Sequence, residues 1–205
     1  TFYRRFVLGE WAAAEGLVYD FFSPELVQAV PEQMDGPWYI SCDYGTVNPT
    51  SMGLWGQKGG VWYRTAEFYY DSRKTGRQQT DGEYADDLAR LAGGQDIRGV
   101  VLDPSAASFR EELLRRGWTV YRAENEVLSG IRRTAELLRA GQLVICTPCE
   151  DAIREFGLYR WDTAVSGDRV VKEHDHAMDD IRYFAVTVAG RRRDGFFAGT
   201  VERSG

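Results

Sequence analysis

The sequence is poor in cysteine, in histidine and in long apolar segments, and each shortage excludes a class of protein. Its 205 residues include 3 cysteines and 2 histidines. A small odd number of cysteines does not suit a secreted domain stapled by disulfides. No apolar run reaches the roughly 18–20 residues of a membrane-spanning helix, so no membrane partner is expected. The first residues contain neither an initiator methionine nor the apolar core of a signal peptide, which predicts an excised, non-secreted piece of a longer chain.

Two of the cysteines, Cys146 and Cys149, have the spacing of a redox pair or of half a zinc site. A zinc site needs further Cys or His ligands, whereas the two histidines, His174 and His176, lie together far downstream. We interpret the cysteines as a buried thiol at a strand end and a thiol at a helix start. The redox pair remains the alternative.

The composition indicates a folded, acidic protein. Hydrophobic residues make up 43% of the chain and aromatic residues 13%, which is enough for a substantial core and excludes general disorder. The formal net charge of -6 argues against a protein that coats nucleic acid. It is compatible with an enzyme that meets DNA through a local basic rim around an acidic metal site.

The order of apolar runs and turn residues predicts an α/β domain over residues 37–190. Three strands joined by short turns predict antiparallel pairing, and the later alternation of helix and strand predicts a mixed sheet with helices on both faces. Residues 1–36 are expected to form a linker or extension, and residues 191–205 a basic, frayed tail. The expected elements are strands over 38–43, 50–57, 61–70, 98–103, 118–122 and 143–146, helices over 81–91, 105–116, 131–138, 151–156 and 175–189, and a hairpin over 159–172.

Two aspartates follow apolar strands directly. Asp43 ends the first strand of the predicted domain, and Asp103 ends the fourth. Sites in open α/β sheets lie beyond the strand ends, so the two carboxylates become neighbours if their strands pair side by side. The structural alternative for each is a turn or helix cap, and Asp103 is placed to cap the helix that follows it.

The last predicted helix supplies further candidates. His176, Asp179 and Asp180 have i, i+3 and i+4 spacing and project on one side of it. Ile181 and Phe184 belong to the opposite, apolar side, which suits packing on the sheet. His176 is equally compatible with a structural hydrogen bond.

Converging carboxylates repel one another unless a cation lies between them. Their hard oxygen ligands suit Mg²⁺ or Mn²⁺ and do not suit zinc. Two such ions, about 3.5–4 Å apart, can support hydrolysis of a phosphodiester. The pattern therefore favours a two-metal phosphodiester hydrolase.

Three segments together resemble the motifs of a known family, the C-terminal nuclease domain of tailed-bacteriophage large terminase subunits, which are DNA-packaging motors. The segments are Asp43-Tyr44-Gly45, Val100-Val101-Leu102-Asp103 and residues 172–183, where a His-x-x-Asp pair ends in Arg-Tyr. Residues 3–19 look like the stretch that joins the ATPase domain to the nuclease. Residues 125–131 also resemble the family, without an assigned role. The resemblance covers nearly the whole chain.

This resemblance implies a ribonuclease H-like fold and a metal-dependent endonuclease that cuts concatemeric double-stranded viral DNA. It implies Asp43, Asp103 and Asp179 as ligands of two Mg²⁺ or Mn²⁺ ions, with His176 beside them and Asp180 as a further ligand. The implied partners are the ATPase domain, the portal protein and the small terminase subunit, at the procapsid portal in the host cytoplasm. No GxxxxGK[ST] phosphate loop occurs in the sequence, so the ATPase half is not expected here.

Contact with DNA is expected to be electrostatic and largely independent of base sequence. The candidate groups are Lys172, which could also neutralise the scissile phosphate, and Arg160, Arg132 and Arg133, together with the arginines at 191–193. Each of them is also compatible with an ordinary solvated surface charge.

Three other functions remain open from the sequence. A resolvase or transposase-like nuclease shares the fold and the carboxylates. A DNA-clamping or portal-docking module would keep its nuclease cryptic outside the motor. A sugar-kinase-like ATPase has the same core topology, but its phosphate-binding glycine turns are not evident.

Overall fold

The computed structural model describes residues 16–164 and 167–190, which contain a seven-stranded mixed sheet. The strand order is β1-β7-β4-β3-β2-β5-β6. β2, β3 and β4 are antiparallel neighbours, and every other pairing in the sheet is parallel. The strands are β1 (Val27–Gln28), β2 (Trp38–Asp43), β3 (Thr50–Lys58), β4 (Val61–Tyr70), β5 (Ile97–Leu102), β6 (Val120–Arg122) and β7 (Leu143–Cys146).

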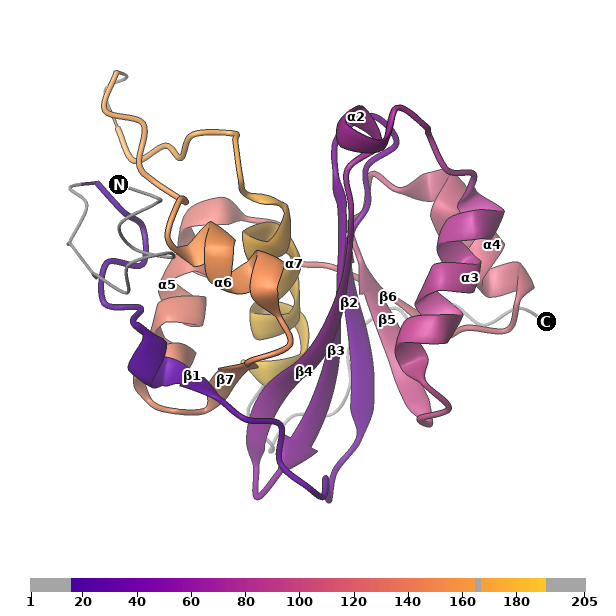
Figure 1. Cartoon of the computed structure of the whole chain (residues 1–205), viewed down its shortest axis with the longest axis horizontal. Helices are drawn as coiled ribbons and strands as arrows, with labels where there is room; N and C mark the ends of the chain where they lie inside the picture. Colours follow the sequence, from indigo (N-terminus) through magenta and orange to yellow (C-terminus); the bar gives the residue numbers. More distant parts are fainter. Residues whose placement is uncertain (1–15, 165–166, 191–205) are drawn as a thin grey trace.

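Helices cover both faces of this sheet, as the sequence predicts. In Figure 1, α3 and α4 lie on one face, and α5, α6 and α7 lie on the other. No helix in the described ranges has the length and apolar character to cross a membrane. The helices are α2 (Ser72–Thr75), α3 (Asp81–Ala92), α4 (Ala107–Arg115), α5 (Val127–Arg139), α6 (Glu150–Phe156) and α7 (His176–Phe184), with a 3-10 turn η1 (Pro24–Leu26) and a π-helical extension of α7, η2 (Ala185–Ala189).

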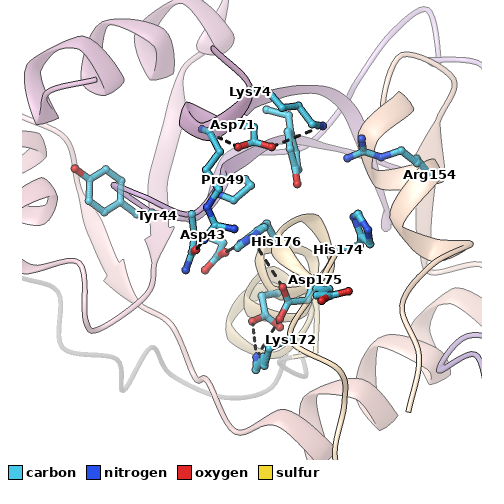
Figure 2. Close-up of a pocket in the computed structure, with 16 residues that line it drawn as sticks. Asp43, Tyr44, Pro49, Asp71, Lys74, Arg154, Lys172, His174, Asp175 and His176 are labelled. Atoms are coloured by element: carbon cyan, nitrogen blue, oxygen red, sulfur yellow. Dashed lines mark hydrogen bonds and ion pairs between the residues drawn. The ribbon is translucent and has the colours of Figure 1, made fainter. Parts of the chain in front are cut away.

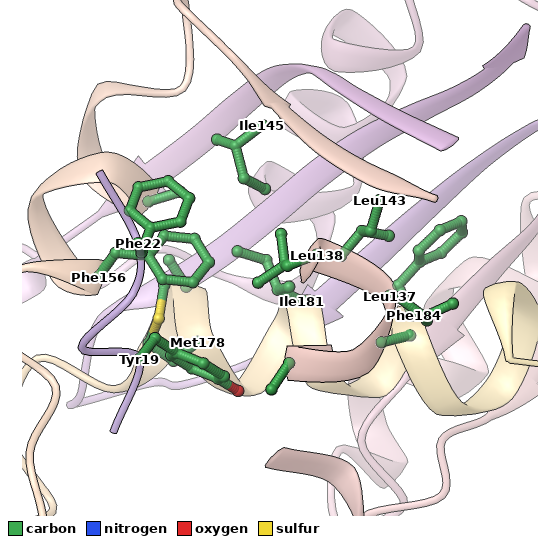
Figure 3. Packing of buried hydrophobic residues seen from close by; sticks show 14 of the residues in the cluster. Tyr19, Phe22, Leu137, Leu138, Leu143, Ile145, Phe156, Met178, Ile181 and Phe184 are labelled. Carbon is green, nitrogen blue, oxygen red and sulfur yellow. The ribbon is translucent and has the colours of Figure 1, made fainter. Parts of the chain in front are cut away.

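The apolar side of α7 packs on the centre of the sheet. Phe184 is fully buried and stacks on Trp55 of β3, with ring centroids 4.2 Å apart and planes 4° apart. Met178 and Ile181 extend this contact along the helix, and Figure 3 shows all three side chains facing the other elements of the core. This packing leaves the other flank of α7 for polar side chains at the edge of the sheet.

Residues 16–28, which belong to the predicted linker or extension over 1–36, pack against the rest of the domain. Tyr19 and Phe22 are each 1% exposed, and Phe22 stacks on Phe156 at 3.9 Å (Figure 3). β1 adds a parallel strand beside β7. The short apolar patches of this segment pack at the edge of the sheet. They have no long helical or strand period, so the sequence gives no sign of this packing. Residues 1–15 and the predicted tail over 191–205 lie outside the described residues.

The predicted hairpin over 159–172 is present only as a narrow pairing. Within the described part of this segment, Trp161 forms an isolated antiparallel bridge with Val170. The backbone N–H of Val171 donates to the carbonyl oxygen of Arg160 at 3.0 Å, and Arg160 also forms an antiparallel bridge with Leu17. The N-terminal segment thus pairs with one side of residues 159–161, and the rest of the hairpin pairs with the other side. Local sequence does not reveal this additional pairing.

Candidate active site

Asp43 and Asp103 lie at adjacent strand ends, as their positions in the sequence predict. β2 and β5 pair in parallel, with Cys42 opposite Leu102. Asp43 is the last residue of β2, and Asp103 follows the last residue of β5. Parallel strands end at the same edge of a sheet, so both carboxylates occur at this edge.

One helix, α7, contacts both strand-end carboxylates. His176 Nδ1 lies 2.9 Å from Asp43 Oδ2, and the Tyr183 hydroxyl donates to Asp103 Oδ2 at 2.6 Å. Asp103 also accepts the backbone N–H of Ser105 at 2.6 Å. Burial opposes ionisation of Asp103, but these donors hold its pKa below the ordinary value. The Arg-Tyr ending of the motif in the sequence therefore has a structural role, because its tyrosine holds Asp103.

Asp179 lies between these two contacts on α7 and is held by two cations. Arg182 Nη2 donates to Asp179 Oδ1 at 2.9 Å. Lys172 Nζ lies 3.4 Å from Asp179 Oδ2 and 3.3 Å from Asp175 Oδ2. Lys172 is thus engaged with carboxylates, and it is also more than half exposed at the pocket (Figure 2).

The segment at residues 125–131, which the sequence leaves without a role, seats Arg182. Arg182 Nη1 donates to the backbone carbonyl oxygens of Asn125 at 2.9 Å and Glu126 at 3.3 Å. A Cβ atom at Gly130 would lie 2.5 Å from Arg182 Cγ, so glycine leaves room for the arginine stem. This segment consequently fixes the group that orients Asp179.

The charge on Asp43 is poorly compensated. Burial raises its pKa to about 6, and the negative charge of Asp179 acts in the same direction, against the hydrogen bond from His176. The pKa of His176 is itself raised: burial opposes the shift, and the contact with Asp43 outweighs it. A cation near Asp43 and Asp179 would relieve this electrostatic cost.

The donor chemistry fits a hard divalent cation. Asp43, Asp103 and Asp179 offer only carboxylate oxygens, which Mg²⁺ and Mn²⁺ prefer. In residues 16–164 and 167–190, however, no three His, Cys, Asp or Glu side chains form a ready-made metal cluster. Each carboxylate is hydrogen-bonded to a side chain of α7.

Asp43, His176 and Asp179 line a pocket of about 600 Å³, shown in Figure 2. Cationic side chains from separate elements surround it. Arg73 and Lys74 come from α2, Arg154 from α6 and Lys172 from the loop before α7. The first three were missed from the sequence, where the stretch 71–80 reads only as polar. The sequence signal that could have indicated them is the adjacent pair Arg73 and Lys74, which closely follows the end of β4.

Asp103 lines a second cavity of about 360 Å³, together with Arg110 and Arg122. The three predicted aspartates therefore do not share one cavity, although two of them end neighbouring strands.

His174, which also lines the larger pocket, has a left-handed backbone (φ 56°), an uncommon conformation for a residue other than glycine.

The other predicted DNA contacts within residues 16–164 and 167–190 do not line either of these cavities. Arg132 and Arg160 are exposed elsewhere on the surface. Arg133 is engaged by Glu136 at 3.0 Å and by the carbonyl oxygen of Gly190 at 3.0 Å. Of the predicted cations in the described residues, Lys172 lines the pocket, and the arginines at 191–193 lie outside those residues.

Asp180 points into the core. Its side chain is fully buried, and its oxygens accept hydrogen bonds from Ser41 at 2.8 Å, from Ser51 and from both terminal nitrogens of Arg64, of which Nη2 lies at 2.9 Å. Consecutive helical residues are about 100° apart around the axis, so Asp179 and Asp180 face different surroundings. The structure does not support the assignment of Asp180 as a metal ligand, because Ser41, Ser51 and Arg64 occupy its oxygens.

The CxxC residues are free, buried thiols. Cys149 Sγ donates to the carbonyl oxygen of Arg64 at 3.2 Å, and Cys146 Sγ lies 3.9 Å from that of Ala29. Burial raises the pKa of Cys146 to about 11 and that of Cys149 to about 12. Both thiols are protonated at neutral pH, which favours the structural interpretation.

Glu155 of α6 supports the first turn of α7 from below the pocket. Its side chain is fully buried and accepts the backbone N–H of Ala177 at 2.7 Å and the Tyr69 hydroxyl at 2.7 Å. Burial raises its pKa to about 7, although these donors and the nearby Arg154 act in the opposite direction. An acidic group at a helix N-terminus also interacts favourably with the helix dipole.

We expect Glu155 to make the stability of the domain depend on pH. Its pKa is higher in the folded than in the unfolded chain, so the folded state binds more protons between pH 4.5 and about 7. The free energy of unfolding should fall across this window as pH rises, by on the order of 3 kcal/mol. Urea denaturation of Glu155→Gln at several pH values should lack this component. Glu150→Gln, at an exposed position of α6, is the control, and identical profiles for parent and Glu155→Gln would contradict the assignment.

The fold is that of a class of viral nuclease domains. The structure resembles the nuclease domain of the P22 large terminase, with a TM-score of 0.67 and 18% identity over 84% of this chain and 92% of that one. It also resembles the large terminase nuclease of the thermophilic phage G20c with bound cobalt, with a TM-score of 0.63 and 15% identity over 84% and 97%. These similarities define a ribonuclease H-like fold, as predicted.

A relative with higher sequence identity identifies the family. The large terminase of another thermophilic bacteriophage, solved with ADP, matches 92% of this chain with 42% identity and a TM-score of 0.81. The match covers 48% of that protein, so the chain spans about half of its length. The chain belongs to the large terminases, in the part that has the nuclease-domain fold. Comparisons with family models and with curated proteins found no match.

Proposed function

We propose that this chain is a metal-dependent endonuclease that cuts double-stranded viral DNA during genome packaging. The observation that carries the proposal is the arrangement around α7. This helix brings Asp179 and His176 to Asp43 at the end of β2, and its Tyr183 holds Asp103 at the end of β5. Such an arrangement concentrates carboxylates at one edge of the sheet, beside a cation-rimmed pocket.

Asp43, Asp103 and Asp179 would hold the metal, which we propose to be two Mg²⁺ or Mn²⁺ ions. Bound there, the ions would supply charge stabilisation for the phosphodiester and a more acidic water nucleophile. His176 orients Asp43 through the contact at Nδ1, and Arg182 orients Asp179. Occupation by metal would require the carboxylates to exchange part of their present hydrogen bonds.

The four pocket cations suit a DNA backbone. Arg73, Lys74, Arg154 and Lys172 come from three separate segments and surround the pocket. A phosphate chain that crosses the pocket would pass several of them in succession, and such contacts are independent of base sequence. Lys172 would approach the scissile phosphate, because it already lies beside Asp179.

We expect substitution of these rim cations to weaken duplex binding and its dependence on salt. Arg73→Gln, Lys74→Gln and Arg154→Gln should each lower the slope of log K against log salt by up to about 0.9 if the side chain contacts one phosphate. Fluorescence anisotropy with a short duplex, in Ca²⁺ so that no cleavage occurs, measures this slope. Arg98→Gln, exposed at the opposite edge of the sheet, is the matched control. Equal slopes for the rim variants and the control would remove these residues from the interface.

A plasmid assay tests the proposed activity. Supercoiled DNA is incubated with the protein in Mn²⁺, in Mg²⁺ or in EDTA. Nicking and linearisation that require the metal support the endonuclease. A four-way junction cut in preference to linear duplex would favour a resolvase instead. Failure to cut in either metal, from a protein with native circular dichroism, would favour a docking module whose nuclease needs the whole motor.

The wider setting is proposed from the family. The relative with 42% identity is about twice as long as this chain and is a large terminase solved with ADP. We place this chain with an ATPase domain, a portal protein and a small terminase subunit at the procapsid portal in the host cytoplasm. Co-purification with a portal ring would test the portal contact.

A further inference from the structure

The third motif contains two consecutive aspartates, and its sequence does not determine which one faces the pocket. Asp179 and Asp180 are adjacent on α7. A rotation of the helix by about 100° would exchange their positions. It would also move His176 and Tyr183 away from Asp43 and Asp103. The rotation of α7 about its axis therefore decides whether the pocket is assembled.

A buried arginine on β4 selects one of these two rotations. Arg64 and Asp180 are both fully buried, and they form a two-pronged ion pair through both terminal nitrogens of the guanidinium. Ser41 of β2 and Ser51 of β3 donate to the same carboxylate. Asp180 is consequently tied to three neighbouring strands. The indole N–H of Trp55 donates to Ser41 Oγ at 2.8 Å, so one of these hydroxyls is itself held in place.

Arg64 has its own supports in the sheet. A Cβ atom at Gly53, on the neighbouring strand β3, would lie 1.9 Å from Arg64 Nη1, so this glycine provides the space for the guanidinium. Glu67 lies 3.4 Å from Arg64 Nη2 and accepts the backbone N–H groups of Asp151 at 2.6 Å and Ala152 at 3.2 Å. The network thus connects the sheet, α6 and α7.

We propose that Arg64 and Asp180 form a positioning pair: they fix the rotation of α7, so that Asp179 and His176 face Asp43. Asp180 touches neither metal nor DNA in this assignment. Buried ion pairs are weak contributors to stability, and their best-attested use is to specify one register among alternatives. The pair acts on the proposed active site, so the inference rests on the proposed function for its catalytic consequence. The effect of the pair on the rotation of α7 does not depend on the proposed function.

The structural test uses the metal-free protein. Hydrogen exchange of the α7 amides is measured in Asp180→Asn, in Arg64→Lys and in the milder Ser51→Ala. Exchange in α7 should rise at least about tenfold in the first two variants, whereas the α3 amides on the other face keep their protection. Leu88→Ala, a core substitution in α3, is the stability control and should loosen α3 without a selective effect on α7. Unchanged α7 exchange in both pair variants would overturn the proposal, whatever the activity of the domain.

The functional test separates a positioning residue from a ligand. Mn²⁺ affinity, by isothermal titration, and kcat and KM for a short duplex are measured for the same variants. The proposal expects Mn²⁺ affinity or kcat to fall about 10–100-fold in both Asp180→Asn and Arg64→Lys, with KM for DNA unchanged. Loss of Mn²⁺ affinity in Asp180→Asn with full affinity in Arg64→Lys would identify Asp180 as a metal ligand and overturn the proposal. Should Asp180→Asn fail to fold, Arg64→Lys and Ser51→Ala carry the test.

Discussion

Replacement of Asp43 by asparagine is expected to lower DNA cleavage by about 10³-fold or more, because a carboxylate that organises divalent cations supplies several kcal/mol of transition-state stabilisation. Asparagine has nearly the same shape, and its side-chain oxygen can still accept from His176, which contacts Asp43 at 2.9 Å. The variant should therefore fold. The measurement is the initial rate of plasmid nicking in Mn²⁺, together with Mn²⁺ titration calorimetry.

The matched control for this substitution is Asp96→Asn. Asp96 is exposed and immediately precedes β5, at the end of that strand opposite to the site. The same chemical change at this position should alter the nicking rate by less than about twofold, as expected for a surface substitution. A folded Asp43→Asn protein that cuts at the parental rate would show that Asp43 has no part in the reaction. The proposed metal site would then have to be abandoned.

The second large effect concerns stability. Arg64→Met leaves the carboxylate of Asp180 fully buried without its cation, and breaking a buried pair in this way costs about 3–5 kcal/mol. That is a large fraction of the roughly 5–15 kcal/mol by which a domain of this kind is stable. Urea denaturation followed by circular dichroism should show a correspondingly lower midpoint.

The double variant Arg64→Met/Asp180→Leu completes a double-mutant cycle, which measures the coupling between the two side chains. Replacing a buried ion pair by apolar groups of similar volume is often neutral or stabilising. The double variant should therefore recover most of the stability lost in Arg64→Met, although Ser41 and Ser51 lose their acceptor. Additive losses in the double variant would mean that Arg64 and Asp180 act independently. The cycle would then contradict the coupling that their contacts imply.

Much of the fold was predictable because the residues within each short segment determine where its strand or helix begins and ends. Apolar runs and turn residues delimit β2, β3 and β4 almost to the residue. The α5 helix extends four residues further at its N-terminus than predicted, to Val127, because Glu126 caps it and accepts from the backbone N–H groups of Leu128 and Ser129. This cap is glutamate rather than the usual Ser, Thr, Asp or Asn, so it is only a weak signal in the sequence.

The N-terminal segment shows where local patterns fail. Tyr19 and Phe22 occur in patches without helical or strand periodicity, so the sequence predicts only a linker or an extension there. Their burial against Phe156 depends on a surface that forms only when α6 has packed on the sheet.

The sequence also contains the rim cations Arg73 and Arg154, but their common pocket joins segments that are about 80 residues apart. No local rule relates such positions.

The sequence by itself determined the class of fold and the most informative carboxylates. Apolar strands that end in Asp43 and Asp103 and a helix with His176 and Asp179 on one flank are local features, because a strand or helix period fixes which side chains share a face. The tertiary structure alone decided that Asp179 faces the pocket and that its neighbour Asp180 is buried. That choice depends on Arg64, which is distant in sequence and is brought beside α7 by the order of the strands in the sheet. A charge in the core requires a partner, and only the assembled sheet supplies it.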